Sequence, residues 1–236
     1  MFRMTKFFRN ATFTRFTHIF LLIGLLSTIP SLHLMLFRLN YADYDFRFKV
    51  QAQSTNQTQL WDLEMFNKSR AYHFIETQVN FGYRIPGTAE NYACLDWIAE
   101  TVKDYGIVQK INFSINGINC AHLLLKINPG QEQIYSFGAH FDTRAVAEKD
   151  SNETLRDDPI LGANDGASGV AVLMEIARIL SNFSSNLTYE YWFLFIDAED
   201  QGNIDSGTFN NWNWCEGSRW FATQMQNSPE KFLSAD

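Results

Sequence analysis

The chain has 236 residues, of which 46% are hydrophobic and 19% charged, so it has enough apolar material for a packed domain and is not a disordered chain. The formal net charge is -7, and no long basic run lies beyond the N-terminal region, which excludes nucleic acid as a partner class. Three cysteines cannot all pair within one chain. Cys94 and Cys120 are a candidate disulfide, because both fall in the same globular region.

The N-terminal segment is predicted to anchor the protein in a membrane. Residues 1–18 form a basic cytoplasmic tail, and residues 19–37 contain no Asp, Glu, Lys or Arg. About twenty such residues span a bilayer as a helix, and a basic flank keeps its end in the cytoplasm. We therefore expect a single-pass protein with an extracellular or luminal domain. A cleaved signal peptide, which would make the protein secreted, is the alternative, although no small-x-small pattern follows the apolar run.

Residues 38–65 are polar and rich in Gln, Asn and Thr, and we expect them to form a stalk ahead of a domain over residues 66–236. Six Asn-x-Ser/Thr triplets follow the apolar run. Because N-glycosylation requires a surface position in an exported protein, these triplets support export. The candidate glycan sites are Asn56, Asn67, Asn112, Asn152, Asn182 and Asn186.

The domain alternates predicted helices and strands. Apolar residues at helical spacing predict helices over residues 67–79, 89–105 and 169–180. Short apolar runs predict strands over residues 108–115, 121–127, 134–140 and 189–196. The last two strands are separated by a helix, which indicates a βαβ unit. The expected fold class is therefore α/β, with a mixed, mostly parallel central sheet flanked by helices.

Three polar clusters lie at strand ends or at a strand-to-helix turn. They occupy residues 138–144 (GAHFDTR), 161–169 (LGANDGASG) and 195–200 (FIDAED). Each cluster alone is typical of a turn or a solvated loop. Sites in open α/β sheets form at the carboxyl ends of strands, so we expect the three clusters to share one crevice. Acids gathered there without a cation would repel one another.

The residue types in these clusters suit zinc. His140 and Asp165 offer imidazole and carboxylate ligands, and a carboxylate can bridge two metal ions. Asp142 is placed to accept the second ring N–H of His140 and fix its tautomer. Neighbouring acids on an extended segment point in opposite directions, so one of Glu199 and Asp200 would bind metal and the other would act as a general base.

The order His-x-Asp, Asn-Asp-Gly-Ala-Ser-Gly, Asp-x-Glu-Asp and Gly-Ser-Arg resembles metallopeptidase family twenty-eight. That family includes zinc aminopeptidases of the bacterial leucyl type and glutaminyl-peptide cyclotransferases. The resemblance covers about residues 66–236 and implies a zinc exopeptidase-like catalytic domain of the phosphorylase/hydrolase-like class, with one or two Zn²⁺ ions. It implies the following roles: His140, Asp165 and Asp200 as metal ligands, Glu199 as general base, and Asp142 and Asp197 as outer supports.

The same resemblance covers two further segments. Residues 84–88 (RIPGT) resemble the family's early Arg-x-Pro-Gly-Ser loop, and residues 217–219 resemble a segment that opens a helix beside the site. The family has two more ligands, an Asp after the next strand and a His near the domain end. Asp236 does not follow an apolar strand as the first of these would. The resemblance therefore implies that the chain is C-terminally incomplete.

The expected activity is that of an aminopeptidase. It would hydrolyse N-terminal residues from peptides or proteins through a metal-activated water, with Glu199 as general base. The first alternative is a glutaminyl-peptide cyclotransferase, which forms N-terminal pyroglutamate. The long aromatic insertion after Asp200 favours it, with Trp212 and Trp214 as candidate pocket walls. The second alternative is an inactive, membrane-tethered family member, because two ligands are missing.

Overall fold

A computed structural model describes residues 65–205, 207–229 and 232. The predicted tail and anchor, almost all of the stalk, and Asn56 lie outside the described residues. Among the residues that are described, no helix has the length and apolar character needed to cross a bilayer.

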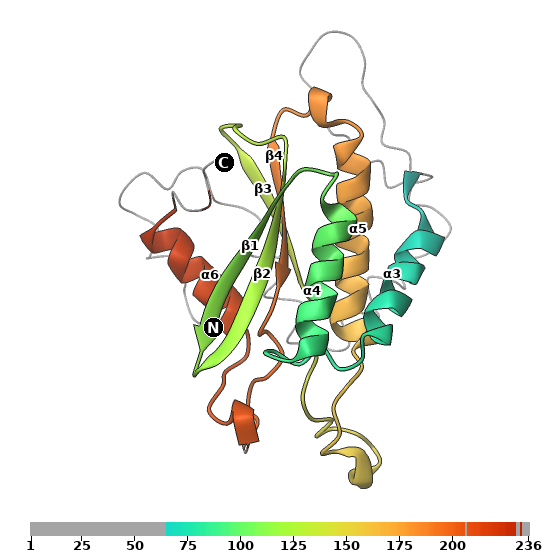
Figure 1. Ribbon diagram of the computed structural model, residues 1–236, viewed down its shortest axis with the longest axis vertical. Coiled ribbons are helices and arrows are strands. Elements are labelled where there is room, and N and C mark those ends of the chain that lie inside the picture. The colour runs from blue at the N-terminus through green and yellow to red at the C-terminus, as the bar shows by residue number, and fades with distance from the viewer. Residues whose placement is uncertain (1–64, 206, 230–231, 233–236) are drawn as a thin grey trace, which may run out of the picture.

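Four strands form one mixed sheet in the order β1-β2-β4-β3 (Figure 1). Their bounds are β1 Ile107–Ile115, β2 Ile118–Ile127, β3 Ile134–His140 and β4 Glu190–Ile196. The expectation of a mostly parallel sheet is wrong for these strands, because β1–β2 and β2–β4 are antiparallel and only β3–β4 is parallel. The reason is that β1 returns directly into β2 through Asn116 and Gly117, both with positive φ, as a two-residue hairpin requires.

Helices cover both faces of this sheet. Figure 1 shows α3 (Lys68–Asn80), α4 (Ala89–Val102) and α5 (Ser168–Ser181) on one face and α6 (Glu216–Asn227) on the other. The three predicted helices are confirmed, although α4 ends three residues earlier than expected. Side-chain caps explain where two of them begin, since Asn67 accepts from the N–H of Arg70 and Thr88 from that of Asn91.

The two central strands are buried on both faces. Alternate residues such as Leu123 and Phe193 pack against the α4 and α5 side. Their neighbours Leu124 and Trp192 pack on the α6 side with Phe221. Each fully buried side chain of this kind contributes about 1.5–3 kcal/mol, so the sheet is a firm platform for whatever its strand ends carry.

Parallel β3 and β4 end side by side. His140 pairs with Ile196, and the N–H of Phe141 donates to the carbonyl of Ile196 at 2.9 Å. The chain between β3 and α5 returns to the same edge, where α5 begins. The three polar clusters therefore emerge at one end of the sheet, as the sequence predicted.

The structure also places the candidate disulfide and five of the candidate glycan sites. Cys94 and Cys120 are buried free thiols, so the candidate disulfide is not formed. The five sequon asparagines that are described are all exposed: Asn67, Asn112, Asn152, Asn182 and Asn186. Their exposure satisfies the geometric requirement for glycosylation, which itself remains a prediction.

Candidate metal centre

His140 and Asp165 meet at the edge of the sheet. Nε2 of His140 lies 3.1 Å from Oδ1 of Asp165, and Nδ1 lies 3.2 Å from the carbonyl of Asp142. The loop before α5 makes this approach feasible because Gly166 has a φ of +91°. A Cβ there would stand 3.1 Å from the carbonyl of Asp142 and 3.5 Å from the ring of His140. A glycine at this position therefore lets Asp165 reach the imidazole.

The pair fits a zinc ion. Two ligands about 2.0 Å from a tetrahedral zinc are about 3.3 Å apart, close to the 3.1 Å between His140 and Asp165. Burial alone would lower the pKa of His140, but hydrogen bonds to Asp142 and Asp165 and their charges outweigh it and raise the pKa well above its usual value. The two acids therefore favour a positive charge at this position, as the ligands of a metal cation do.

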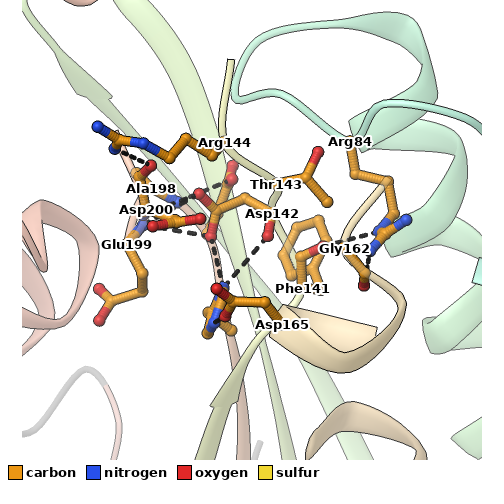
Figure 2. Close-up of polar contacts among 12 residues, drawn as sticks. Arg84, Phe141, Asp142, Thr143, Arg144, Gly162, Asp165, Ala198, Glu199 and Asp200 are labelled. Atoms are coloured by element: carbon orange, nitrogen blue, oxygen red, sulfur yellow. Dashed lines mark hydrogen bonds and ion pairs between the residues drawn. The ribbon is translucent and has the colours of Figure 1, made fainter. Parts of the chain in front are cut away.

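Asp142 is the centre of the hydrogen-bond network at this edge. Its buried carboxylate accepts from the main-chain N–H groups of Glu199 and Asp200, each at 3.2 Å, and its Oδ1 lies 3.4 Å from Nδ1 of His140. Figure 2 shows Asp142 between Asp165 and the segment that follows β4. Asp142 therefore contacts His140, as its predicted supporting role requires, and it also fixes the main chain that carries the two neighbouring acids.

Glu199 is held by the start of α6. Its two carboxylate oxygens accept from the main-chain N–H of Ser218 at 2.6 Å and from the Ser218 hydroxyl at 3.0 Å. Burial is the main cause that raises the pKa of Glu199 to about 7, against the lowering effect of the Ser218 hydrogen bonds. A carboxylate with a pKa near 7 is well suited to accept and return a proton at neutral pH. The sequence pointed to the Gly-Ser-Arg segment but not to this role of Ser218.

Asp200 lies on the neighbouring segment but does not form a three-ligand cluster with His140 and Asp165. Burial first, and then the charges of Asp142 and Asp165, raise the pKa of its carboxyl group to about 7. Within the described ranges, no three His, Cys, Asp or Glu side chains are close enough together to hold a metal ion. The structure thus joins His140 to Asp165, and Asp200 would have to turn toward them to complete a three-ligand set.

Asp197, the other predicted outer support, lies directly after β4. It is fully buried and accepts from the side chain of Asn91 at 3.0 Å and from the N–H of Ala121 at 3.1 Å. Burial and the nearby charge of Asp142 raise its pKa. Asp197 therefore connects the end of β4 to α4 and β2, and within the described part of the chain its hydrogen bonds do not include His140.

His122 is a buried neighbour that the sequence did not single out. Its Nδ1 accepts from the N–H of Asp197 at 3.1 Å, which leaves Nε2 to donate to the carbonyl of Gly217 at 3.1 Å. Burial lowers the pKa of His122 to about 3, so the ring is neutral. It joins β2 to the start of α6, the helix that holds Glu199.

The aromatic insertion after Asp200 has one buried and one exposed tryptophan. Trp212 is 2% exposed and packs edge-on against Phe209, so the prediction that it lines a substrate pocket is wrong for this structure. Trp214 is 39% exposed and stacks over the guanidinium of Arg144 at 4.5 Å. Arg144 in turn donates to the main-chain carbonyl of Asp200 at 2.9 Å, which links the exposed ring, through Arg144, to the segment that bears the acids.

Comparisons with known proteins identify relatives of this chain. Residues 122–235 match the sequence profile of Peptidase family M28. A probable zinc metalloprotease of Pyricularia oryzae is 31% identical over an alignment of 127 residues, and the alignment covers 47% of this chain and 24% of that protein.

Two solved structures are similar in both sequence and fold. A Porphyromonas gingivalis glutaminyl cyclase is 35% identical with a TM-score of 0.61, over 67% of this chain and 55% of that one. A leucine aminopeptidase precursor from Bacteroides thetaiotaomicron is 32% identical with a TM-score of 0.60, over 66% of this chain and 56% of that one. The chain thus spans just over half the length of these structures and about a quarter of the curated relative.

Proposed function

We propose, because residues 122–235 match peptidase family M28, that the chain is a zinc-dependent enzyme that cyclises the N-terminal glutamine of peptides to pyroglutamate. His140, Asp165 and Asp200 would hold the metal. Zinc, when bound, supplies a positive charge that polarises the substrate's side-chain amide. The acid-rich edge also suits a substrate that carries a free, cationic α-amine.

Glu199 is the proposed proton carrier. The substrate's α-ammonium group first loses a proton to solvent. The neutral amine nitrogen then attacks the side-chain amide carbon, the new C–N bond closes the ring, and the bond to the amide nitrogen breaks to release ammonia. Glu199 accepts the proton that the amine loses and returns it to the departing nitrogen. The two hydrogen bonds from Ser218 keep this carboxylate in place, and its pKa of about 7 suits transfer in both directions.

The exposed ring of Trp214 is the observation that carries the choice of cyclisation. Arg144 links this ring to the main chain that bears Glu199 and Asp200. An apolar wall beside the acids suits the methylene groups of a folded-back glutaminyl side chain. The likeness to the P. gingivalis glutaminyl cyclase supports the same choice.

Hydrolysis of the N-terminal residue is the second candidate. The likeness to a leucine aminopeptidase precursor and to a probable zinc metalloprotease favours it. The same residues serve that reaction, with Glu199 accepting a proton from the attacking water. A third candidate, an inactive family member, requires that the acids do not retain zinc.

One assay series separates the three candidates. The zinc-loaded protein is offered a Gln-initiated dipeptide and, separately, aminoacyl chromogenic amides, and its zinc content is measured. We expect ammonia release from the dipeptide and little cleavage of the amides. The reverse result supports the aminopeptidase, and neither reaction with little zinc supports the inactive protein. The variant Glu199→Gln is expected to keep its zinc and lose at least about 100-fold in turnover, the usual scale for a general base. Retained turnover refutes the role of Glu199.

We also propose that the protein is a single-pass membrane glycoprotein with its enzyme domain outside the cytoplasm, the secreted form being the alternative. The apolar run of residues 19–37 and the exposure of five sequon asparagines support this. Expression in a eukaryotic secretory system tests it. A glycosidase should increase electrophoretic mobility, and alkaline carbonate should leave the protein in the membrane pellet.

A further inference from the structure

A buried arginine lies beneath the loops of the metal centre. The Arg84 side chain is 0% exposed, and each of its hydrogen bonds goes to a main-chain carbonyl group. Burial lowers the pKa of Arg84, while the thiol of Cys94 and the charge of Asp142 act to raise it. Keeping such a group out of water is costly unless its hydrogen bonds are satisfied, so its position needs a structural reason.

The acceptors of Arg84 belong to three separate segments. Nε donates to the carbonyl of Phe141 at 2.9 Å, directly after His140. The two terminal nitrogens donate to the carbonyls of Leu161 at 3.0 Å and Gly162 at 2.9 Å, which open the loop that carries Asp165. Further bonds reach the end of α3. Figure 2 shows the guanidinium beside Gly162 and Phe141. One planar group therefore connects the segment of His140 to the segment of Asp165.

The main chain of Arg84 holds the same region from a second point. Its carbonyl accepts from the N–H of Thr143 at 3.0 Å and from the side chain of Asn91 at 3.1 Å. Arg84 thus contacts the residue before Asp142 through its side chain and the residue after Asp142 through its main chain. The strand end that carries His140 and Asp142 is fixed on both sides.

The loop that carries Asp165 packs closely against Arg84 and Thr143 at Gly162. Gly162 has a φ of +60°, and a Cβ there would lie 2.5 Å from Cγ2 of Thr143 and 3.2 Å from a terminal nitrogen of Arg84. A shorter or differently shaped side chain at position 84 would lose the hydrogen bonds that join this loop to the strand end of His140. Lysine would keep the charge but has no planar fork of donors.

We propose that Arg84 is a positioning residue that sets the spacing between His140 and Asp165 and thereby the zinc affinity of the centre. The proposal rests on the proposed function only in taking these two side chains as zinc ligands. It predicts that zinc binding, rather than folding alone, depends on the guanidinium.

The test measures zinc dissociation constants of the full chain by competition with a chromogenic chelator. Arg84→Met and Arg84→Lys are compared with Arg178→Met, a matched control on α5. Arg178 pairs with the buried Glu175, so the control also loses a buried arginine contact but away from the metal centre. Urea unfolding of the metal-free proteins shows how much stability each variant loses.

We expect the dissociation constant to rise about 10–100-fold in Arg84→Met, the range seen when outer partners of metal ligands are removed, and within twofold of wild type in Arg178→Met. Wild-type affinity in both Arg84 variants overturns the proposal. So does an equal loss in Arg178→Met at matched stability, or failure of both Arg84 variants to fold. Wild-type protein that binds zinc but turns over neither substrate refutes the proposed function and leaves the Arg84 comparison intact.

Discussion

Replacing Asp142 by Asn tests how far the metal centre depends on one buried carboxylate. Its oxygens accept from the main-chain N–H groups of Glu199 and Asp200 and face Nδ1 of His140 at 3.4 Å. Asparagine has nearly the same shape, but only one of its two terminal atoms accepts a hydrogen bond. Whichever way the amide turns, its NH₂ group faces either the main-chain donors or the imidazole.

The structure sets the expected size of the effect. A hydrogen bond to a charged group contributes about 1.5–3 kcal/mol, and the variant loses at least one such bond. Removing a negative charge relieves repulsion with Asp165 and Asp200, so the net loss of metal-free stability should be about 2 kcal/mol. That relief does not help zinc, because the cation is attracted by the charge that has been removed. The zinc dissociation constant should therefore rise about 10–100-fold.

Chelator competition and urea unfolding measure the two quantities separately. Asp96→Asn is the matched control, because it makes the same chemical change at an exposed acid that pairs with Lys110. We expect the control to change zinc affinity by less than twofold. If Asp142→Asn also binds zinc within twofold of wild type, the reasoning that this carboxylate orients His140 and the 199–200 segment is wrong.

Two predictions concern the contacts that pack the start of α6 against the sheet. The pKa of His122 is about 3 when folded and 6.5 when unfolded, so the unfolded chain takes up the proton first and stability is lost as pH falls below 6.5. His122 should therefore lower the free energy of unfolding by about 1.4 kcal/mol for each pH unit below 6.5. The variant His122→Phe should show a correspondingly smaller drop between pH 6.5 and 5. Plots of unfolding free energy against pH that run parallel for the two proteins would contradict this. In Gly217→Ala the new Cβ would lie 1.8 Å from the carbonyl oxygen of Asp197. Thermal or urea unfolding should therefore report a loss of about 3 kcal/mol in stability. Unchanged stability would mean that α6 does not pack against Asp197 this closely.

The secondary structure was predictable because apolar periodicity marks elements directly. Helical spacing and short apolar runs placed α3, α4, α5 and the four described strands within a few residues, whereas they did not predict α6. Strand direction was not predictable in the same way, since an apolar run reads alike in parallel and antiparallel sheets. The turn chemistry did carry that information. Asn116 and Gly117 are the pair that a two-residue hairpin favours, and they specify that β1 and β2 are antiparallel.

The acids of the site were predictable because they follow strands, whereas the residues that hold them were not. Arg84 contacts a carbonyl 57 positions away, and His122 contacts groups 75 and 95 positions away. No local pattern encodes such distances. What made Arg84 and Ser218 visible in the sequence was only the resemblance of their segments to a family, and the contacts supply the physical reason for both.

The two tryptophans of the insertion show that composition alone does not tell which aromatic side chain could contact a substrate. Trp212 and Trp214 are the same residue type in the same insertion, yet Trp212 is buried and Trp214 is exposed and stacks on Arg144. Trp214→Ala is therefore expected to lower kcat/KM for a Gln-initiated dipeptide about tenfold, the value of roughly 1.4 kcal/mol of lost apolar contact, without changing zinc affinity. Trp212→Ala should act mainly through stability, costing about 3 kcal/mol. If Trp214→Ala cyclises the dipeptide as fast as wild type, the exposed ring is not a substrate wall, and the case for cyclisation over hydrolysis loses its structural support.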